Sequence, residues 1–121
     1  MPSRYWIAWN TGLTISPDTQ LLFNTALANL AHSKGLTVAL KNDVEQVPDL
    51  APYFDYAINE QCQQYNECGN YTTYFINAGK TTFQVEYKLS LTKFCPQANA
   101  ANRNAITKTF DLFDTPWTPC R

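Results

Sequence analysis

Short apolar segments alternate with helix-like segments along this sequence, and this alternation constrains the fold more than any other feature. Residues 36–40, 53–58 and 81–85 are apolar and rich in aromatic or β-branched side chains, and each segment is followed directly by polar residues. The stretches between them are long enough for the crossover of a dozen or more residues that a pair of parallel strands requires. The sequence therefore predicts an α/β fold with three to four parallel strands and flanking helices.

A helix is predicted before the first of these strands. Its start is marked by a capping residue, a proline and an acid at consecutive positions, Ser16, Pro17 and Asp18. Apolar residues then recur at helical spacing over residues 22–31, and Gly35 supplies a stop. His32 falls on the polar side of this helix, so we interpret it as a surface histidine rather than a catalytic one.

The C-terminal third predicts a last helix and an extended tail. The helix is indicated by small and apolar side chains at helical spacing, namely Ala98, Ala101, Ala105 and Ile106. Residues 115–120 contain two prolines, which favour an extended chain.

Polar side chains gather where the three predicted strands end. The first strand is followed by Lys41, Asn42 and Asp43, the second by Asn59 and Glu60, and the third by Glu86 and Tyr87. In a parallel α/β sheet, functional groups gather at the carboxyl ends of the strands, because only the loops there are free to vary. We therefore expect these side chains to converge on one cleft. Two alternatives stay open: Asp43 could be a helix cap or a surface ion-pair partner, and Glu60 could simply pair with Lys41.

The residue types at the strand ends favour acid and base chemistry. The sequence has no Gly-rich phosphate loop and no metal-ligand pattern, so neither a cofactor nor a metal is expected. Carboxylates beside aromatic side chains favour general acid and base catalysis, and glycoside hydrolysis by two carboxyl groups leads that class. Glu60 is the candidate catalytic residue. Tyr56, Ile58 and Tyr65 are expected to supply apolar surroundings that raise its pKa.

Charge and hydropathy exclude two classes of partner. Nine basic and ten acidic residues leave a net charge of -1, without a basic stripe that would attract phosphate backbones or anionic lipids. The apolar stretches stay far below the ~20 residues that span a bilayer. We therefore expect neither a nucleic-acid partner nor a membrane partner.

The four cysteines, Cys62, Cys68, Cys95 and Cys120, favour disulfides over zinc. Their number is even, a single histidine accompanies them, and their spacing fits no zinc pattern. A bridge between the first two would stiffen the loop after the second strand, and a bridge between the last two would pin the tail across the last helix. The glycosylation sequon at Asn70 agrees with secretion, whereas the first residues lack the architecture of a signal peptide. We expect either that the chain stays inside the cell or that its true N-terminus is missing.

Several motifs resemble one family of enzymes. KGLTVALKND, FDYAINEQCQQYNEC, FINAGKTTFQVEY and CPQANAANRNAI occur in this order, and together they are similar to the C-terminal part of glycoside hydrolase family 114, the endo-α-1,4-polygalactosaminidases. The resemblance begins at about Asn10 and implies a partial (β/α) TIM-type barrel. It also implies that Glu60 is a catalytic carboxylate, that Asp43 and Glu86 line the same groove, and that the substrate is a polysaccharide of α-1,4-linked galactosamine. The amines of such a substrate would be cations, which suit carboxylates beside tyrosines.

The chain departs from this family at its beginning. Family members carry a second catalytic aspartate on an aspartate-rich strand end shortly before the segment that matches residues 10–12, whereas SRYWIAWN stands there in this chain. A full (β/α)8 barrel also needs roughly 250 residues. We therefore interpret residues 1–121 as a single domain that forms the C-terminal portion of such a barrel, with residues 1–9 divergent or mis-started.

A barrel portion of this kind is expected to be an impaired hydrolase. The alternative is a non-catalytic, carbohydrate-binding or vestigial half-barrel. Its open sheet edges predict self-association. The family and the cysteine content together predict a secreted or extracellular protein.

Overall fold

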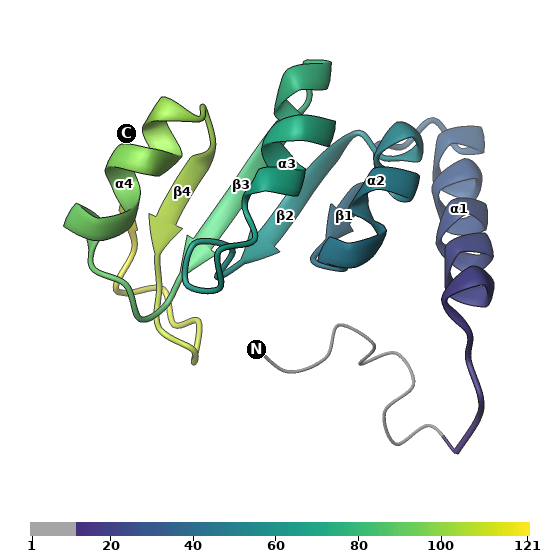
Figure 1. The fold of residues 1–121 in the computed structure, drawn as a ribbon, viewed down its shortest axis with the longest axis horizontal. Coiled ribbons are helices and arrows are strands. Elements are labelled where there is room, and N and C mark those ends of the chain that lie inside the picture. Colours follow the sequence, from purple (N-terminus) through teal and green to yellow (C-terminus); the bar gives the residue numbers. More distant parts are fainter. Residues whose placement is uncertain (1–11) are drawn as a thin grey trace.

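The computed structural model describes residues 12–121 as a five-stranded sheet with helices along it (Figure 1). The strands are β1 (Ala39–Lys41), β2 (Tyr56–Glu60), β3 (Thr81–Glu86), β4 (Asn104–Thr107) and β5 (Thr118–Pro119). They lie side by side in this order, with the first four parallel and β5 antiparallel to β4. The predicted α/β fold of parallel strands and flanking helices is therefore confirmed. The prediction about residues 1–9 lies outside the described residues.

The register of the sheet brings the predicted strand ends together. Lys41 of β1 is level with Ile58 of β2, and Glu60 is level with Val85 of β3. Glu86 is in turn level with Thr107 of β4. The polar groups that follow each strand therefore meet at one edge of the sheet, as expected for parallel strands.

One long helix precedes β1, and short helices and turns follow between the strands. They are α1 (Pro17–Ser33), η2 (Val44–Gln46), α2 (Val47–Leu50), η3 (Ala51–Tyr53), α3 (Gly69–Tyr74), η4 (Ile76–Ala78) and α4 (Leu91–Ala100). Figure 1 shows α2, α3 and α4 in a row along the sheet, with α1 beyond β1 at the end of that row. The main core lies beneath this row, where Leu50, Tyr71 and Phe75 pack with Ala57 of β2. A smaller cluster lies between α4 and β4.

Helix α1 begins as the sequence predicts but is less buried than its pattern suggests. The Ser16 hydroxyl accepts a hydrogen bond from the backbone N–H of Thr19 at 3.1 Å, and Gly35 follows the helix with a left-handed φ of 73°. Of the helix itself, only Ala28 is buried. Leu22 is 74% exposed and Leu30 is 54% exposed. The apolar stripe of α1 is therefore largely uncovered.

The last helix ends earlier than the sequence predicts. We expected Ala105 and Ile106 to continue it, and this is wrong, because α4 ends at Ala100 and both residues belong to β4. Asn102 adopts a left-handed φ of 61°, which a continuing helix does not allow. Ala105 is instead level with Gln84 of β3. The spacing of the alanines across the turn is also compatible with a helix, but residues 104–107 pair with β3 and form a strand.

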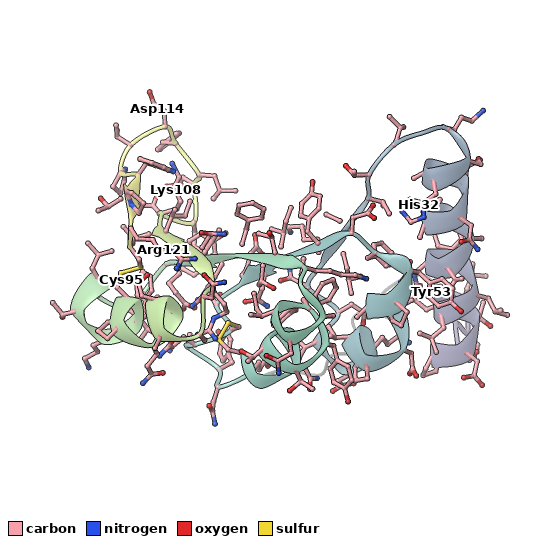
Figure 2. All side chains as sticks on the ribbon, turned by 90° about the horizontal axis from the view of Figure 1, so that it is seen from above. His32, Tyr53, Cys95, Lys108, Asp114 and Arg121 are labelled. Carbon is pink, nitrogen blue, oxygen red and sulfur yellow. A yellow bond between two sulfur atoms is a disulfide. The ribbon has the colours of Figure 1, made fainter. Side chains whose placement is uncertain are left out.

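The two faces of the sheet differ in cover. Successive residues of a strand point to opposite faces, so Ala57, Thr82 and Gln84 are buried beneath the helices. On the other face Phe83 is 45% exposed, and its ring meets the edge of Tyr56 with 5.9 Å between the ring centroids. Figure 2 shows α2, α3 and α4 on one side of the sheet and side chains projecting from the other, with α1 at the end of the sheet. Among the described residues, no helix covers this second face, which we call the open face.

Both expected disulfides form. Cys62–Cys68 closes a short loop directly after β2, and Cys95–Cys120 joins α4 to the tail across 25 residues of sequence. The backbone N–H of Cys120 also donates to the carbonyl of Ala105 at 2.9 Å. The second bridge therefore holds β5 against β4.

We predict that replacing both Cys95 and Cys120 with serine lowers the free energy of unfolding by about 3 kcal/mol, because the open chain gains the entropy that the bridge removes. Urea denaturation followed by tryptophan fluorescence measures the change. Lys93→Ala, an exposed substitution on the same helix, is the control and should stay within about 0.5 kcal/mol of the original chain. An unchanged midpoint for the serine variant would show that the bridge does not hold the tail.

Candidate active site

Glu60 lies at the end of β2 on the open face, where neighbouring strand ends reach it. The hydroxyl of Tyr87 donates to Oε1 of Glu60 at 2.9 Å, and Nζ of Lys41 lies 3.5 Å from the same oxygen. Lys41 comes from β1, and Tyr87 directly follows β3. The Glu60 side chain is 31% exposed, so its carboxylate is partly shielded yet accessible. Three of the predicted site residues therefore meet at one point.

Asn42 joins this cluster from the end of β1. Its Nδ2 donates to Oε2 of Glu60 at 3.4 Å, while its Oδ1 accepts the backbone N–H of Glu60 at 2.8 Å. Asn42 adopts a left-handed φ of 56°, which asparagine tolerates better than most residues. Its own N–H continues the ladder to the carbonyl of Ile58 at 2.9 Å. Asn42 thus fastens the end of β1 to the end of β2.

These contacts set the charge of Glu60. Burial alone would raise the pKa of Glu60, but the hydrogen bond from Tyr87, the charge of Lys41 and the Asn42 donor together lower it below its ordinary value. The sequence predicted a raised pKa, and the structure corrects this expectation, because polar donors from β1 and β3 outweigh the apolar neighbours. A carboxylate that stays ionised suits a nucleophile or a base better than an acid. The ion pair with Lys41 that we considered as an alternative is also present, but an exposed lysine contributes little stability.

Asp43 lies near the cluster but faces a different space. It is 8% exposed and adopts a left-handed φ of 56° before η2, where its side chain makes no capping hydrogen bond. Its Oδ2 is buried and has no hydrogen-bond partner in the described part of the chain, and Asp43 lines a cavity of about 230 Å³ between α1 and β1. Burial, followed by the charge of Glu45, raises the pKa of Asp43 to about 6. Within residues 12–121, Asp43 forms neither the cap nor the ion pair that we considered for it.

Asn59 and Glu86 point away from the open face. Asn59 is 1% exposed, donates to the hydroxyl of Tyr71 at 3.1 Å and accepts the N–H of Cys62 at 2.7 Å. Glu86 is fully buried and accepts the N–H of Gln63 at 3.0 Å. Each is an immediate neighbour of a residue on the open face, and strand alternation turns it to the helix side. The sequence suggested that Glu86 lies in the groove with Glu60. The structure instead places Glu86 on the helix side of the sheet.

No hydrogen bond or ion pair within residues 12–121 joins the remaining predicted residues to Glu60. Tyr65 is 38% exposed in the loop after β2. Asn70 belongs to α3, where its Nδ2 donates to the carbonyl of Val44 at 3.0 Å. His32 pairs with Asp55 at 2.9 Å, and Figure 2 shows it at the opposite end of the molecule from the C-terminal disulfide. The interpretation of His32 as a surface residue agrees with this position.

Phe110 belongs beside the site, although the sequence did not single it out. Its ring lies 4.6 Å from the ring of Tyr87, and Nζ of Lys88 lies 5.6 Å from its centroid. Phe110 is 59% exposed and begins the turn that follows β4. Had β4 been recognised, the rule that functional groups follow parallel strands would have pointed to this residue.

Residues 12–121 contain neither a metal-binding cluster nor a membrane-spanning helix. No group of three or more His, Cys, Asp or Glu side chains in that range could hold a metal ion. None of the helices there has the length and apolar character that a bilayer crossing requires.

Two comparisons with known proteins give matches. The model of glycoside-hydrolase family GH114 matches residues 4–121. The crystal structure of Aspergillus fumigatus Ega3 in complex with galactosamine is 30% identical to this chain and matches it with a TM-score of 0.76. The match covers 91% of this chain and 49% of that one, so this chain spans about half the length of the Ega3 structure, and its sheet corresponds to part of a TIM-type fold. No curated protein matches the sequence.

We predict that Tyr87→Phe raises the pKa of Glu60, because the variant lacks the hydroxyl that stabilises the ionised carboxylate. A carboxyl ¹³C NMR titration of Glu60 measures the change. Tyr65→Phe removes a hydroxyl from the loop after β2 and should leave the titration unchanged. Equal titration curves for the original chain and Tyr87→Phe would show that this hydrogen bond does not set the charge.

The same pair predicts a loss of stability at high pH. Burial, then the hydrogen bond and charge of Glu60, raises the pKa of Tyr87 from its ordinary 10.0 to about 12. The folded state therefore holds this proton more tightly than the unfolded state, and the resulting stabilisation is complete below pH 10.0 and lost as pH rises through about 12. Urea denaturation between these pH values should show this loss in the original chain and not in Tyr87→Phe.

Proposed function

The chain belongs to glycoside-hydrolase family GH114, and from this membership we propose that it forms the part of a galactosaminidase that carries the carboxylate Glu60. The observation that supports this most directly is the cluster at the end of β2. There Glu60 is kept ionised on the open face by donors from two neighbouring strands. Such a preorganised carboxylate is the element that glycoside hydrolysis requires of each side of the scissile bond.

The proposed substrate is a polymer of α-1,4-linked galactosamine. Ega3, whose structure matches this chain, was crystallised with galactosamine. A protonated amino sugar is a cation, and an ionised Glu60 is its natural partner. The exposed rings of Tyr87 and Phe110, which lie 4.6 Å apart, add aromatic faces that attract both cations and sugar rings. Charge and shape at this site therefore agree on one class of ligand.

Glu60 acts as the nucleophile or base, and a second carboxyl group must act as the acid. Neither of the other candidate carboxylates among the described residues contacts Glu60. Glu86 is buried on the opposite face, and Asp43 lines the cavity beside α1. We infer that the acid partner comes from the remainder of a barrel, so that the chain by itself binds the sugar but hydrolyses it poorly. A purely carbohydrate-binding half-barrel is the second candidate, and the open face of the sheet favours it. Neither candidate needs a cofactor.

We propose a secreted or extracellular location. The two disulfides in the structure fit an oxidising compartment. The Asn70 sequon fits the same compartment, although the Asn70 amide already donates to the carbonyl of Val44.

We predict that the purified chain binds α-1,4-linked galactosamine oligomers with little turnover, and that Glu60→Gln weakens this binding about tenfold because it removes a charged hydrogen-bonding partner. Isothermal titration calorimetry measures the affinity, and chromatography of the oligomers measures turnover. Asp49→Asn makes the same chemical change on the exposed side of α2 and should bind like the original chain.

Either of two results would contradict this proposal. Rapid hydrolysis by the chain alone would show that its catalytic pair is complete. Equal affinity for galactosamine oligomers and their N-acetylated forms, which carry no amine charge, would show that the carboxylate does not select a cation.

The open face also predicts self-association, because a sheet that is apolar on one uncovered side gains stability when a second copy buries it. We expect the chain to form dimers that analytical ultracentrifugation detects at micromolar concentration. Phe83→Lys places a charge on the open face and should weaken dimerisation about tenfold or more. Tyr74→Lys, an exposed position on α3, is the control and should not weaken it. A monomer at all concentrations would rule out this surface.

A further inference from the structure

Glu86 is the most deeply buried carboxylate among the described residues, and both of its carboxylate oxygens accept hydrogen bonds. It is 0% exposed at the end of β3. Its Oε2 accepts the backbone N–H of Gln63 at 3.0 Å and the side-chain amide of Gln84 at 2.7 Å. Its Oε1 accepts the backbone N–H of Gln64 at 3.3 Å. Two of these donors belong to the loop of residues 61–68, which begins directly after Glu60.

A buried cation balances this carboxylate through one side chain. Arg103 is 4% exposed, and its Nε donates to Oε1 of Gln84 at 2.8 Å, while the amide of the same glutamine donates to Glu86. The guanidinium also donates to the hydroxyl of Thr72 on α3 at 3.3 Å. Burial lowers the pKa of Arg103, and the charge of Glu86 acts in the opposite direction. The two charges are thus joined by Gln84 beneath the helices.

The buried charges of Glu86 and Arg103 are not explained by a gain in stability. Burying two opposite charges costs desolvation that apolar side chains of similar size would avoid. What the arrangement does provide is positioning, because the Glu86 carboxylate fixes backbone amides of the loop that follows the neighbouring strand β2. The next residue, Tyr87, points to the opposite face and donates to Glu60 at 2.9 Å. Two consecutive residues of one strand therefore hold the end of β2 from both faces.

Other contacts hold the same loop at other points. The N–H of Gln61 donates to the carbonyl of Val85 at 2.7 Å, which extends the strand ladder by one residue. The N–H of Cys62 donates to Asn59, and the disulfide to Cys68 closes the loop on itself. The side-chain amide of Gln63 donates to Oε1 of Gln97 on α4, and the carbonyl of Gln63 accepts the N–H of Asn66 at 3.2 Å. None of these contacts binds the backbone N–H groups of Gln63 and Gln64. Glu86 supplies the anchor at that point.

We propose that Glu86 is a positioning residue, which holds the loop of residues 61–68 against β3 and so fixes the end of β2 from the face opposite to Glu60. Its effect on a reaction rests on the function proposed above, whereas the positioning itself does not. Glu86 touches neither the open face nor any group there, so it acts on Glu60 through the backbone.

The test compares Glu86→Gln with Thr82→Val by hydrogen exchange of backbone amides. Glu86→Gln keeps the size of the side chain but replaces one of its two acceptor oxygens with an NH₂ donor. The N–H groups of Gln63 and Gln64 bind different oxygens of Glu86, so they cannot both keep their present acceptors. The amides of these two residues should exchange about tenfold faster or more, beyond any change in the strand amides that reports global stability. Thr82 is fully buried on the same face of β3, and its hydroxyl has no hydrogen-bond partner among residues 12–121, so Thr82→Val should leave both amides unchanged.

A second readout separates positioning from simple stability. The carboxyl ¹³C titration of Glu60 should shift in Glu86→Gln toward the ordinary value of 4.5 and stay unchanged in Thr82→Val, because only a displaced β2 end loosens the donors on Glu60. If Glu86→Gln does not fold, the double variant Glu86→Gln, Arg103→Met removes both buried charges and should show the same two changes.

The outcomes distinguish this proposal from the proposed function. Unchanged exchange at Gln63 and Gln64 together with an unchanged Glu60 titration would overturn the positioning role, even if the chain binds galactosamine. Uniformly faster exchange without a Glu60 shift would also overturn it, because that result describes a structural residue. Both readouts need no sugar, so failure to bind galactosamine would leave the positioning role standing and remove only the proposed substrate.

Discussion

The hydrogen bonds at the end of β2 organise the candidate site, and they depend on the alternation of side chains along β3. Glu86 and Tyr87 are consecutive, so one accepts loop amides beneath the helices while the other donates to Glu60 on the open face. A register slip of one residue would exchange these roles, because every side chain of a strand would change face. The pairing of Glu60 with Val85 therefore decides which carboxylate a substrate can reach.

The covered and open faces of the sheet divide the polar residues into two groups with different tasks. Beneath the helices, Asn59, Gln84 and Arg103 are buried and hydrogen-bonded, which is the condition under which polar groups persist in a core. On the open face, Glu60 keeps part of its surface accessible and its donors keep it ionised. Residues that stabilise the core and residues of the candidate site are therefore neighbours on the same strands, but their side chains lie on opposite faces.

The sequence predicts the parallel strands and their polar ends, because apolar runs and helix signals are local. It also predicts both disulfides and the α1 cap. The sequence does not reveal which face each strand-end residue takes, since the face depends on where a strand stops. For this reason Glu86 is expected in the groove, whereas the structure places it in the core. The direction of the Glu60 pKa shift is missed for a similar reason. Lys41 and Tyr87 are distant in sequence, and only the register brings their donors to this carboxylate. β4 is missed because its alanine also fits a helix.

Three unsatisfied features meet at the β1 edge of the sheet, and they share one physical cause. In the described part of the chain β1 pairs with β2 alone, Leu27 of α1 is 46% exposed beside the cavity, and Oδ2 of Asp43 is buried there without a partner. An open edge and an unpaired buried oxygen are each unfavourable. One further parallel strand beside β1 would pair the edge, cover α1 and bring donors toward Asp43. Its carboxyl end would also stand beside those of β1 and β2, which is where the proposed hydrolysis would need an acid partner for Glu60. We therefore propose that the open edge of the described sheet and the lack of an acid partner among the described residues have one common cause, and the proposed impairment of hydrolysis rests on it.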